Sequence, residues 1–151
     1  MQESAVREIM TEFVQTIPTG STIMEAAQIM TKGGIGCVVV TEKGNPIGML
    51  TERDIVSKVT SQDLNSSKVL VEKIMSRPII TIDPNEIIDE AALMMSIYGI
   101  RRLVVVGKDG ILSGIITTTD IASWISRNKD YKNNALNAIV KLHDTEHIPY
   151  Q

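Results

Sequence analysis

The chain has 151 residues, of which 43% are hydrophobic and 22% charged, and its formal net charge is −3 at pH 7. This length allows one compact domain or two fused half-domains, and the composition is that of an ordinary globular protein. The negative charge argues against a DNA-binding surface. An aromatic content of 3% argues against a site that stacks nucleic-acid bases between rings.

The sequence also bears on the cellular compartment. No apolar run is long enough to span a membrane, and Met1 to Ser4 lack the character of a signal peptide. The one cysteine, Cys37, cannot form a disulfide within the chain, which suits a reducing compartment. We therefore expect a soluble cytoplasmic protein with no membrane span and no nucleic-acid partner.

The chain contains an internal repeat, the first feature to test because it decides the fold. Residues 6–11 read Val-Arg-Glu-Ile-Met-Thr, and residues 71–76 read Val-Glu-Lys-Ile-Met-Ser. The same shift aligns Thr16 with Thr81, Glu25 with Glu90, Met30 with Met95, and Gly34 with Gly99. After one extra residue in the second copy, the aligned pairs are Gly48 with Gly114, Thr51 with Thr117, and Asp54 with Asp120.

The repeat divides the chain into parts. We expect a first repeat at residues 1–60, a polar linker at 61–70, a second repeat at 71–127, and a C-terminal helix and tail at 128–151. The residue pattern of each repeat predicts a short strand, a helix, a strand, a tight turn, another strand and a final helix. The strands are predicted at 16–17, 37–41 and 47–50, and at 79–82, 103–106 and 112–116, with turns at 43–46 and 108–110.

The first helix of each repeat shows apolar residues three and four apart, and glycines end it. Its apolar face carries Ile23, Ala26, Ala27 and Met30 in the first repeat, and Ile88, Ala91, Ala92 and Met95 in the second. The strands contain continuous runs of valine and isoleucine. Both faces of each sheet should therefore be covered.

The C-terminal part contains an amphipathic stretch, made of Ala135, Leu136, Ile139, Val140 and Leu142. It predicts a last helix, packed on the body of the protein or on a second subunit. His143 and His147 are spaced as two metal ligands on one helix face would be. The nearby Pro149 favours a solvated tail instead, so we expect no metal site.

The final helix of each repeat is predicted to begin at a Thr-x-x-Asp motif. One interpretation is capping alone, in which the threonine oxygen and the acid each accept the other's backbone N–H and the charge suits the helix N-terminus. The other interpretation adds a ligand, because a carboxylate at such a turn can accept both vicinal hydroxyls of a ribose. It would repel phosphates, which then need cations from elsewhere. Repetition of the motif favours the second interpretation.

The sequence offers little for catalysis. His143 and His147 are the only histidines, and there is no Ser-His-acid set, no Cys-x-x-Cys and no Walker-type phosphate loop. Asp54 and Asp120 occupy equivalent places in two repeats, which suggests two clefts and not one acid–base pair. We therefore expect that the protein is not an enzyme.

Two ordered runs of Ile-Met, Thr-Ile, Glu-Ala-Ala, Gly-Ile, Val-Val-Val and Gly-x-x-Thr-x-x-Asp-Ile resemble the tandem CBS (cystathionine-β-synthase) domain, or Bateman module, from about residue 6 to about residue 125. The resemblance implies an α/β (α+β) fold of two β-α-β-β-α repeats, paired through their sheets about a pseudo-two-fold axis with clefts between them. It implies no cofactor but a regulatory adenosine ligand, with AMP, ADP or ATP ahead of S-adenosylmethionine or NAD. Such modules report ligand levels to an enzyme, channel or transporter and commonly form homodimers.

The resemblance also implies a ribose-binding acid, a motif hydroxyl and an adenine-pocket threonine in each copy. These are Asp54, Thr51 and Thr16 in the first repeat, and Asp120, Thr117 and Thr81 in the second. Arg101 and Arg102 match a basic pair that, in related modules, faces the phosphates of the ligand held by the other repeat. The alternative is that both arginines are solvated surface cations.

The repeats differ where the first has Gly36 and Cys37 and the second has Arg101 and Arg102. Small residues let a base approach the backbone, and guanidinium forks suit phosphate oxygens. We therefore expect one better site, with adenine against Ile35 and Gly36, the ribose on Asp54, and the phosphates on Arg101, Arg102 and Arg53. The cleft at Asp120, in the repeat where Ile100 is the counterpart of Ile35, would carry less positive charge and bind weakly or hold a neutral ligand.

Two functions stay open at this point. The first is a stand-alone regulatory module that binds an adenosine-containing ligand and signals to an unidentified partner protein. The second is a structural adaptor whose repeats serve dimerisation and partner docking, with empty clefts.

Overall fold

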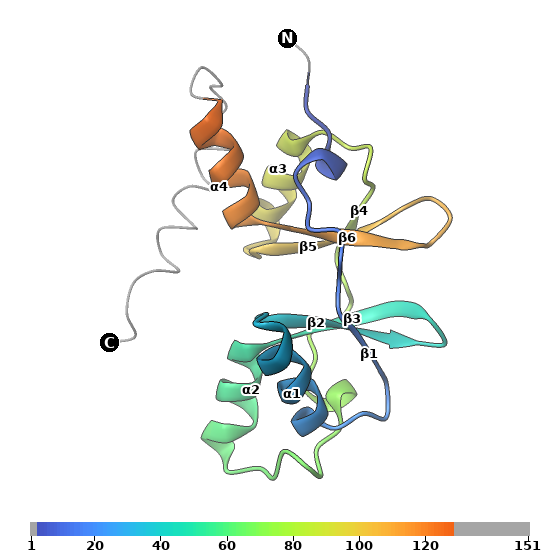
Figure 1. Cartoon of the computed structure of the whole chain (residues 1–151), viewed down its shortest axis with the longest axis vertical. Helices are drawn as coiled ribbons and strands as arrows, with labels where there is room; N and C mark the ends of the chain where they lie inside the picture. Colours follow the sequence, from blue (N-terminus) through green and yellow to red (C-terminus); the bar gives the residue numbers. More distant parts are fainter. Residues whose placement is uncertain (1–2, 129–151) are drawn as a thin grey trace. The chain divides into compact units, whose positions relative to one another are not determined.

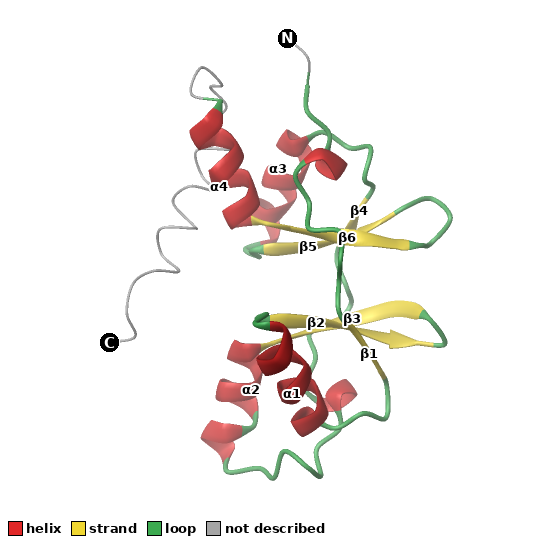
Figure 2. Ribbon diagram, viewed as in Figure 1, coloured by secondary structure: helices red, strands yellow, loops and turns green. Residues whose placement is uncertain are grey.

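The structure, a computed structural model, describes residues 3–128 and divides into two compact units. The first unit is Phe13–Ile80, and the second unit joins Met1–Glu12 to Thr81–Gln151. Each unit has a three-stranded sheet with its two α-helices on one face of that sheet (Figures 1 and 2). This confirms the predicted mixed α/β fold of two equivalent halves. The amphipathic stretch at 135–142 and the histidines at 143 and 147 lie outside the described residues.

The elements of the first unit follow the predicted order. They are β1 (Thr16–Pro18), α1 (Ile23–Gly33), β2 (Cys37–Glu42), β3 (Asn45–Thr51) and α2 (Glu52–Lys58). The strand order is β1-β2-β3, with β1 parallel to β2 and β3 antiparallel to it. The final helix thus begins directly where an edge strand ends.

The hairpin of the first unit is tighter than predicted. Lys43 and Gly44 have φ values of 50° and 81°, which suit a two-residue turn between antiparallel strands. β3 therefore starts at Asn45, and Pro46 lies within the strand and not in the turn. A proline is tolerated there because β3 is an edge strand.

The second unit repeats this plan. Its elements are β4 (Thr81–Ile82), α3 (Ile88–Tyr98), β5 (Arg102–Val106), β6 (Leu112–Thr117) and α4 (Thr118–Arg127). The strand order is β4-β5-β6, again with one parallel and one antiparallel pair. The two halves therefore share strand order and strand direction.

The predicted helix ends and buried faces are largely confirmed. Gly34 and Gly99 end α1 and α3 in the left-handed conformation, with φ of 60° and 63°. All the predicted apolar helix positions are buried except Ala27, which is half-buried. The apolar strand runs are buried as predicted: Val38, Val39 and Val40 in β2, and Leu103, Val104 and Val105 in β5, have no exposed surface.

The short leading segment of each sequence repeat packs in the unit of the other repeat. Thr11 exchanges backbone hydrogen bonds of 2.8 and 3.0 Å with Ile115 of β6. In the same way Ser76 exchanges bonds of 2.9 and 3.1 Å with Met49 of β3, and Val71 is fully buried in the core of the first unit. The limits of the sequence repeats therefore differ from the limits of the compact units.

A substitution at Gly114 tests whether the N-terminal segment packs against β6. A β-carbon at this position would lie 2.6 Å from the carbonyl oxygen of Thr11 and 2.9 Å from Sδ of Met10. Because Thr11 is bonded to Ile115, it can retreat only by breaking that pair. We expect Gly114→Ala to lower the free energy of unfolding in urea by about 1–3 kcal/mol.

The adjacent change Ser113→Ala is the control, with an expected effect within about 0.5 kcal/mol. Equal stability of the two variants would mean that residues 3–12 do not lie against β6.

Candidate functional site

The Thr-x-x-Asp motif of the first unit forms a reciprocal cap at the start of α2. The backbone N–H of Asp54 donates to Oγ1 of Thr51 at 3.1 Å. The backbone N–H and the hydroxyl of Thr51 donate to Oδ2 of Asp54 at 2.9 and 3.0 Å. The capping part of the sequence interpretation is therefore confirmed.

The motif of the second unit has the same geometry at the start of α4. Asp120 donates its backbone N–H to Oγ1 of Thr117 at 3.1 Å. Thr117 donates its N–H and its hydroxyl to Oδ2 of Asp120 at 2.9 and 3.0 Å. In both motifs Oδ2 receives the two bonds from threonine, and Oδ1 is left for other partners.

The two motifs differ in what approaches Oδ1. Nζ of Lys58 lies 3.2 Å from Oδ1 of Asp54, one helical turn along α2, and also donates to the carbonyl oxygen of Ile74 at 3.2 Å. The equivalent position in α4 holds Trp124, whose side chain is buried and carries no charge. Within residues 3–128 no ion pair forms at Asp120. Sequence reasoning missed Lys58, although a lysine four residues after an acid on a helix is a recognisable signal.

The surroundings of Asp120 disfavour the ionised form of its carboxyl group. Burial raises its pKa above the ordinary value, and the hydrogen bonds from the backbone and side chain of Thr117 only partly oppose this shift. Without a cation beside it in the described chain, the ionised group gains from any donor that reaches Oδ1.

The structure brings a second group of candidate residues beside each motif. The carbonyl oxygen of Gly36 accepts the N–H of Glu52 at 2.9 Å, which places Ile35 and Gly36 next to the start of α2. The carbonyl oxygen of Arg101 accepts the N–H of Thr118 at 3.0 Å, and Arg102 pairs with Thr117 in the sheet. Each unit thus gathers the segment before its central strand and its own Thr-x-x-Asp motif.

The remaining candidates lie around these segments. Thr16 and Thr81 are exposed on β1 and β4, where they pair with Val39 and Val104. Arg53 is exposed, whereas Arg101 and Arg102 are half-buried, which argues against fully solvated surface cations.

Asp54 belongs to one compact unit, and Arg101 and Arg102 belong to the other. Their convergence on one ligand stays a prediction.

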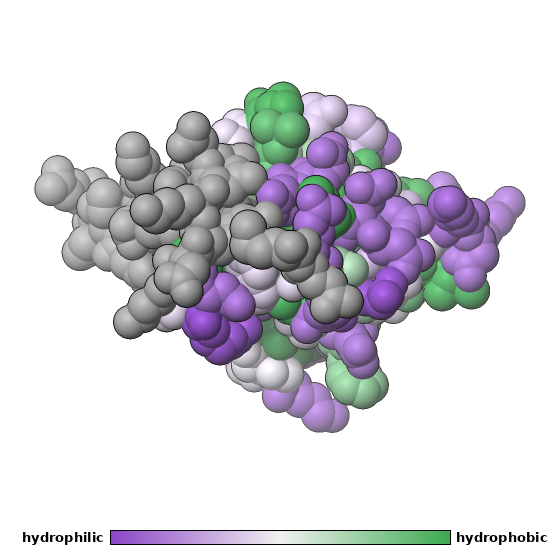
Figure 3. All heavy atoms as spheres, turned by 90° about the horizontal axis from the view of Figure 1, so that it is seen from above, coloured by the Kyte–Doolittle hydropathy of each residue, from purple (hydrophilic) through white to green (hydrophobic). Residues whose placement is uncertain are grey.

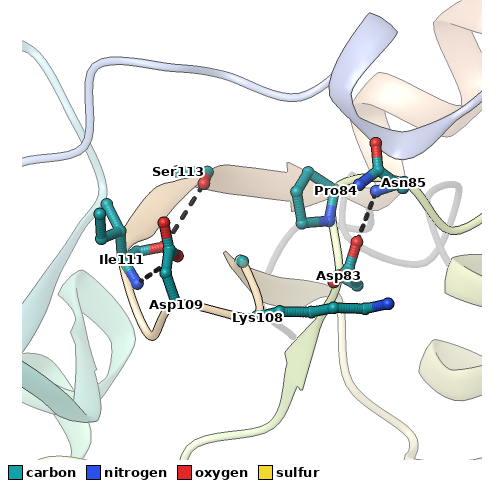
Figure 4. Close-up of a pocket in the computed structure, with 8 residues that line it drawn as sticks. Asp83, Pro84, Asn85, Lys108, Asp109, Ile111 and Ser113 are labelled. Atoms are coloured by element: carbon teal, nitrogen blue, oxygen red, sulfur yellow. Dashed lines mark hydrogen bonds between the residues drawn. The ribbon is translucent and has the colours of Figure 1, made fainter.

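A surface pocket of about 410 Å³ lies elsewhere in the second unit, between residues 83–85 and the β5–β6 hairpin (Figure 4). Sequence reasoning did not predict it, and no candidate ligand residue lines it. Oδ1 of Asp83 accepts the N–H of Asn85 at 2.8 Å, and Oδ1 of Asp109 accepts the N–H of Ile111 at 3.0 Å. Each of these two carboxylates therefore stabilises the turn in which it lies.

Metal-binding clusters and membrane-spanning helices are both absent from the described part of the chain. Residues 3–128 contain no group of three or more side chains suited to hold a metal ion. Over the same residues, no helix combines the length and the apolar character needed to cross a bilayer.

Comparison with known proteins places these features in a family. A family model for the CBS domain matches residues 6–61 and 71–127. An uncharacterized protein of Methanopyrus kandleri, MK0525, is 43% identical over 122 residues, 80% of this chain and 62% of that protein. The CBS domain-containing protein YhcV of Bacillus subtilis is 34% identical over 119 residues, 79% of this chain and 84% of that protein.

Solved structures show the same likeness. The CBS domain pair of protein MJ0100, in complex with 5′-methylthioadenosine and S-adenosyl-L-methionine, matches with a TM-score of 0.75 and 30% identity. The match covers 84% of this chain and 99% of that one. Longer proteins also contain a similar region. The L-aspartate semialdehyde sulfurtransferase of Methanosarcina acetivorans is 31% identical over 81% of this chain but only 24% of its own length.

The variant Asp120→Asn tests the burial of the carboxyl group, because an amide oxygen can still accept the bonds from Thr117. In the unfolded chain the carboxyl group of Asp120 has its ordinary pKa of 3.8, and in the folded chain its pKa is higher. At pH values between these two pKa values, the folded chain keeps a proton that the unfolded chain has lost. This group therefore makes folding less favourable as pH rises from 3.8 through the folded pKa.

We expect the free energy of unfolding of the wild type, relative to Asp120→Asn, to fall over that pH range in urea titrations. A relative stability that increased with pH would contradict burial as the dominant influence on this carboxyl group.

Proposed function

Because the chain belongs to the CBS domain family, as a tandem pair, we propose that it binds an adenosine-containing ligand at its Thr-x-x-Asp motifs and signals the ligand to a partner protein. The observation that carries this proposal is the pair of caps that present Oδ1 of Asp54 and Asp120 at two equivalent strand-to-helix turns. Each cap leaves the Oδ1 oxygen of its aspartate outside the cap, since threonine donates only to Oδ2.

The ligand class follows from the chemistry of the site. An ionised carboxylate only accepts hydrogen bonds, so vicinal ribose hydroxyls are suitable donors. The related MJ0100 pair binds 5′-methylthioadenosine and S-adenosyl-L-methionine, which share an adenosine part. The half-buried Arg101 and Arg102 could serve phosphates, which supports AMP, ADP or ATP ahead of S-adenosylmethionine or NAD.

We propose a binding role and not a catalytic one. The two motif carboxylates start equivalent helices in separate units, which favours two equivalent binding positions over one acid–base pair. For the relatives with enzyme names, the similar region is a minor part of the length, and we propose that their chemistry resides outside it. The cytoplasm stays the proposed location.

The surface of α3 supports a homodimer. Leu93 and Ile97, four residues apart, are 43% and 68% exposed. Their counterparts on α1 are the polar residues Gln28 and Lys32. In the face shown in Figure 3, hydrophobic residues reach the surface as separate patches among hydrophilic ones. Two copies of the apolar α3 face could cover each other across a two-fold axis. This face also favours the second candidate function, an adaptor for dimerisation without ligand.

Ligand binding is tested by thermal unfolding with adenosine, AMP and ATP. A site filled at 100 times its dissociation constant stabilises the folded state by about 2.7 kcal/mol, so we expect a measurable rise in melting temperature. In the double variant Asp54→Asn with Asp120→Asn, each cap keeps an acceptor but the ribose meets an amide. We expect the rise to disappear there.

The control variant is Asp109→Asn, which changes an acid of the separate surface pocket and should keep the full rise. If the wild type shows no rise with any of the three compounds, the adaptor function is the correct one.

The dimer is tested by light scattering across a concentration series. We expect a dimer for the wild type and a shift toward monomer for Ile97→Asp, because a carboxylate would be buried in an apolar interface. The matched control is Val56→Asp on α2, since Val56 is 62% exposed. Equal dissociation of both variants, or a monomeric wild type, would contradict an interface on α3.

A further inference from the structure

The number of free acceptor positions differs between the two motifs. An ionised carboxylate offers about four acceptor positions, roughly two on each oxygen. At both motifs the N–H and the hydroxyl of threonine fill the two positions of Oδ2. A ribose with two neighbouring hydroxyls must therefore bind through Oδ1, and it needs both positions of that oxygen.

At Asp54 one of these positions is already taken. Nζ of Lys58 lies 3.2 Å from Oδ1, and the same ammonium group is held by the carbonyl oxygen of Ile74 at 3.2 Å. The carboxylate side chain is 14% exposed and the lysine side chain 46%, so water screens the pair only in part. A second partner on the buried Ile74 keeps the ammonium in place, so a ribose hydroxyl has to compete with it.

At Asp120 no such competitor is present in the described chain. The position of Lys58 is taken by Trp124, 9% exposed, and Oδ1 of Asp120 accepts no hydrogen bond from residues 3–128. No residue among 3–128 thus occupies either acceptor position of this oxygen, which a diol needs. The caps of the two motifs are otherwise the same in their hydrogen-bond lengths.

We propose that Lys58 is a specificity-determining residue, which weakens ribose binding at Asp54 and makes Asp120 the tighter ribose site. The proposal rests on the proposed function, because it concerns the same ligand contact. It differs from the expectation based on Arg101 and Arg102, since those residues bear on phosphates and Lys58 bears on the sugar. A neutral nucleoside separates the two effects.

The test is calorimetric titration of the full chain with adenosine, which carries no phosphate. The variant Asp120→Asn leaves only the Asp54 copy, and Lys58→Met is then added to remove the ammonium while keeping the length of the side chain. We expect Lys58→Met to tighten adenosine binding about threefold to tenfold in this background, the range for the net contribution of one ordinary hydrogen bond. Asp54→Asn alone should bind adenosine more tightly than Asp120→Asn alone.

Two controls separate the Lys58 effect from general charge. Lys68→Met removes an exposed lysine of the same unit and should leave the affinity of Asp120→Asn unchanged. Lys58→Arg keeps a cation at the position and should keep the binding weak. Circular dichroism confirms that each variant is folded.

The outcomes distinguish this proposal from the proposed function. An unchanged or weaker affinity after Lys58→Met, or tighter binding at Asp54 than at Asp120 in the single variants, would overturn the role of Lys58 while leaving adenosine binding established. Absence of adenosine binding in every variant would also overturn it. The melting temperature of the wild type with AMP and ATP then decides separately whether the proposed function holds.

Discussion

The reciprocal hydrogen bonds between a threonine and an aspartate three residues later are the contact on which both halves of this protein depend. They start α2 directly at the end of β3 and α4 directly at the end of β6. Because they engage only Oδ2, they also fix the direction of Oδ1. One local contact therefore joins strand to helix and leaves an oriented acceptor at the junction.

Duplication preserves the backbone of this junction and leaves its surroundings free to diverge. Lys58 and Trp124 occupy the same place in the two units, but the first adds an ammonium beside the acid and the second is a buried indole without a charge. Lys32 and Ile97 are a second such pair, on the outer face of α1 and of α3. Two units with the same backbone fold can therefore differ in the side chains that contact a ligand or a partner protein.

Each compact unit is completed by residues from outside its own repeat. Val6 and Val71 are both fully buried, each in the unit that contains the other repeat's sheet. The backbone pairs of Thr11 with Ile115 and of Ser76 with Met49 extend this packing to the sheets. Neither repeat, cut at its sequence boundary, would keep these contacts, so the two repeats depend on one continuous chain.

The elements, the helix stops at Gly34 and Gly99, and the caps at Thr51 and Thr117 could be predicted from the amino-acid sequence, because periodicity, turn residues and capping act over a few neighbouring positions. The family came from the resemblance of the two ordered motif runs to the CBS domain. The ribose role of Asp54 and Asp120 was inferred from the acceptor chemistry of the motif and from the family resemblance, and it stays a prediction. The three-dimensional contacts were needed to show that the first segment packs with the second repeat, and that Lys58 donates to the carbonyl oxygen of Ile74. These contacts join residues far apart in the chain, so no local pattern encodes them.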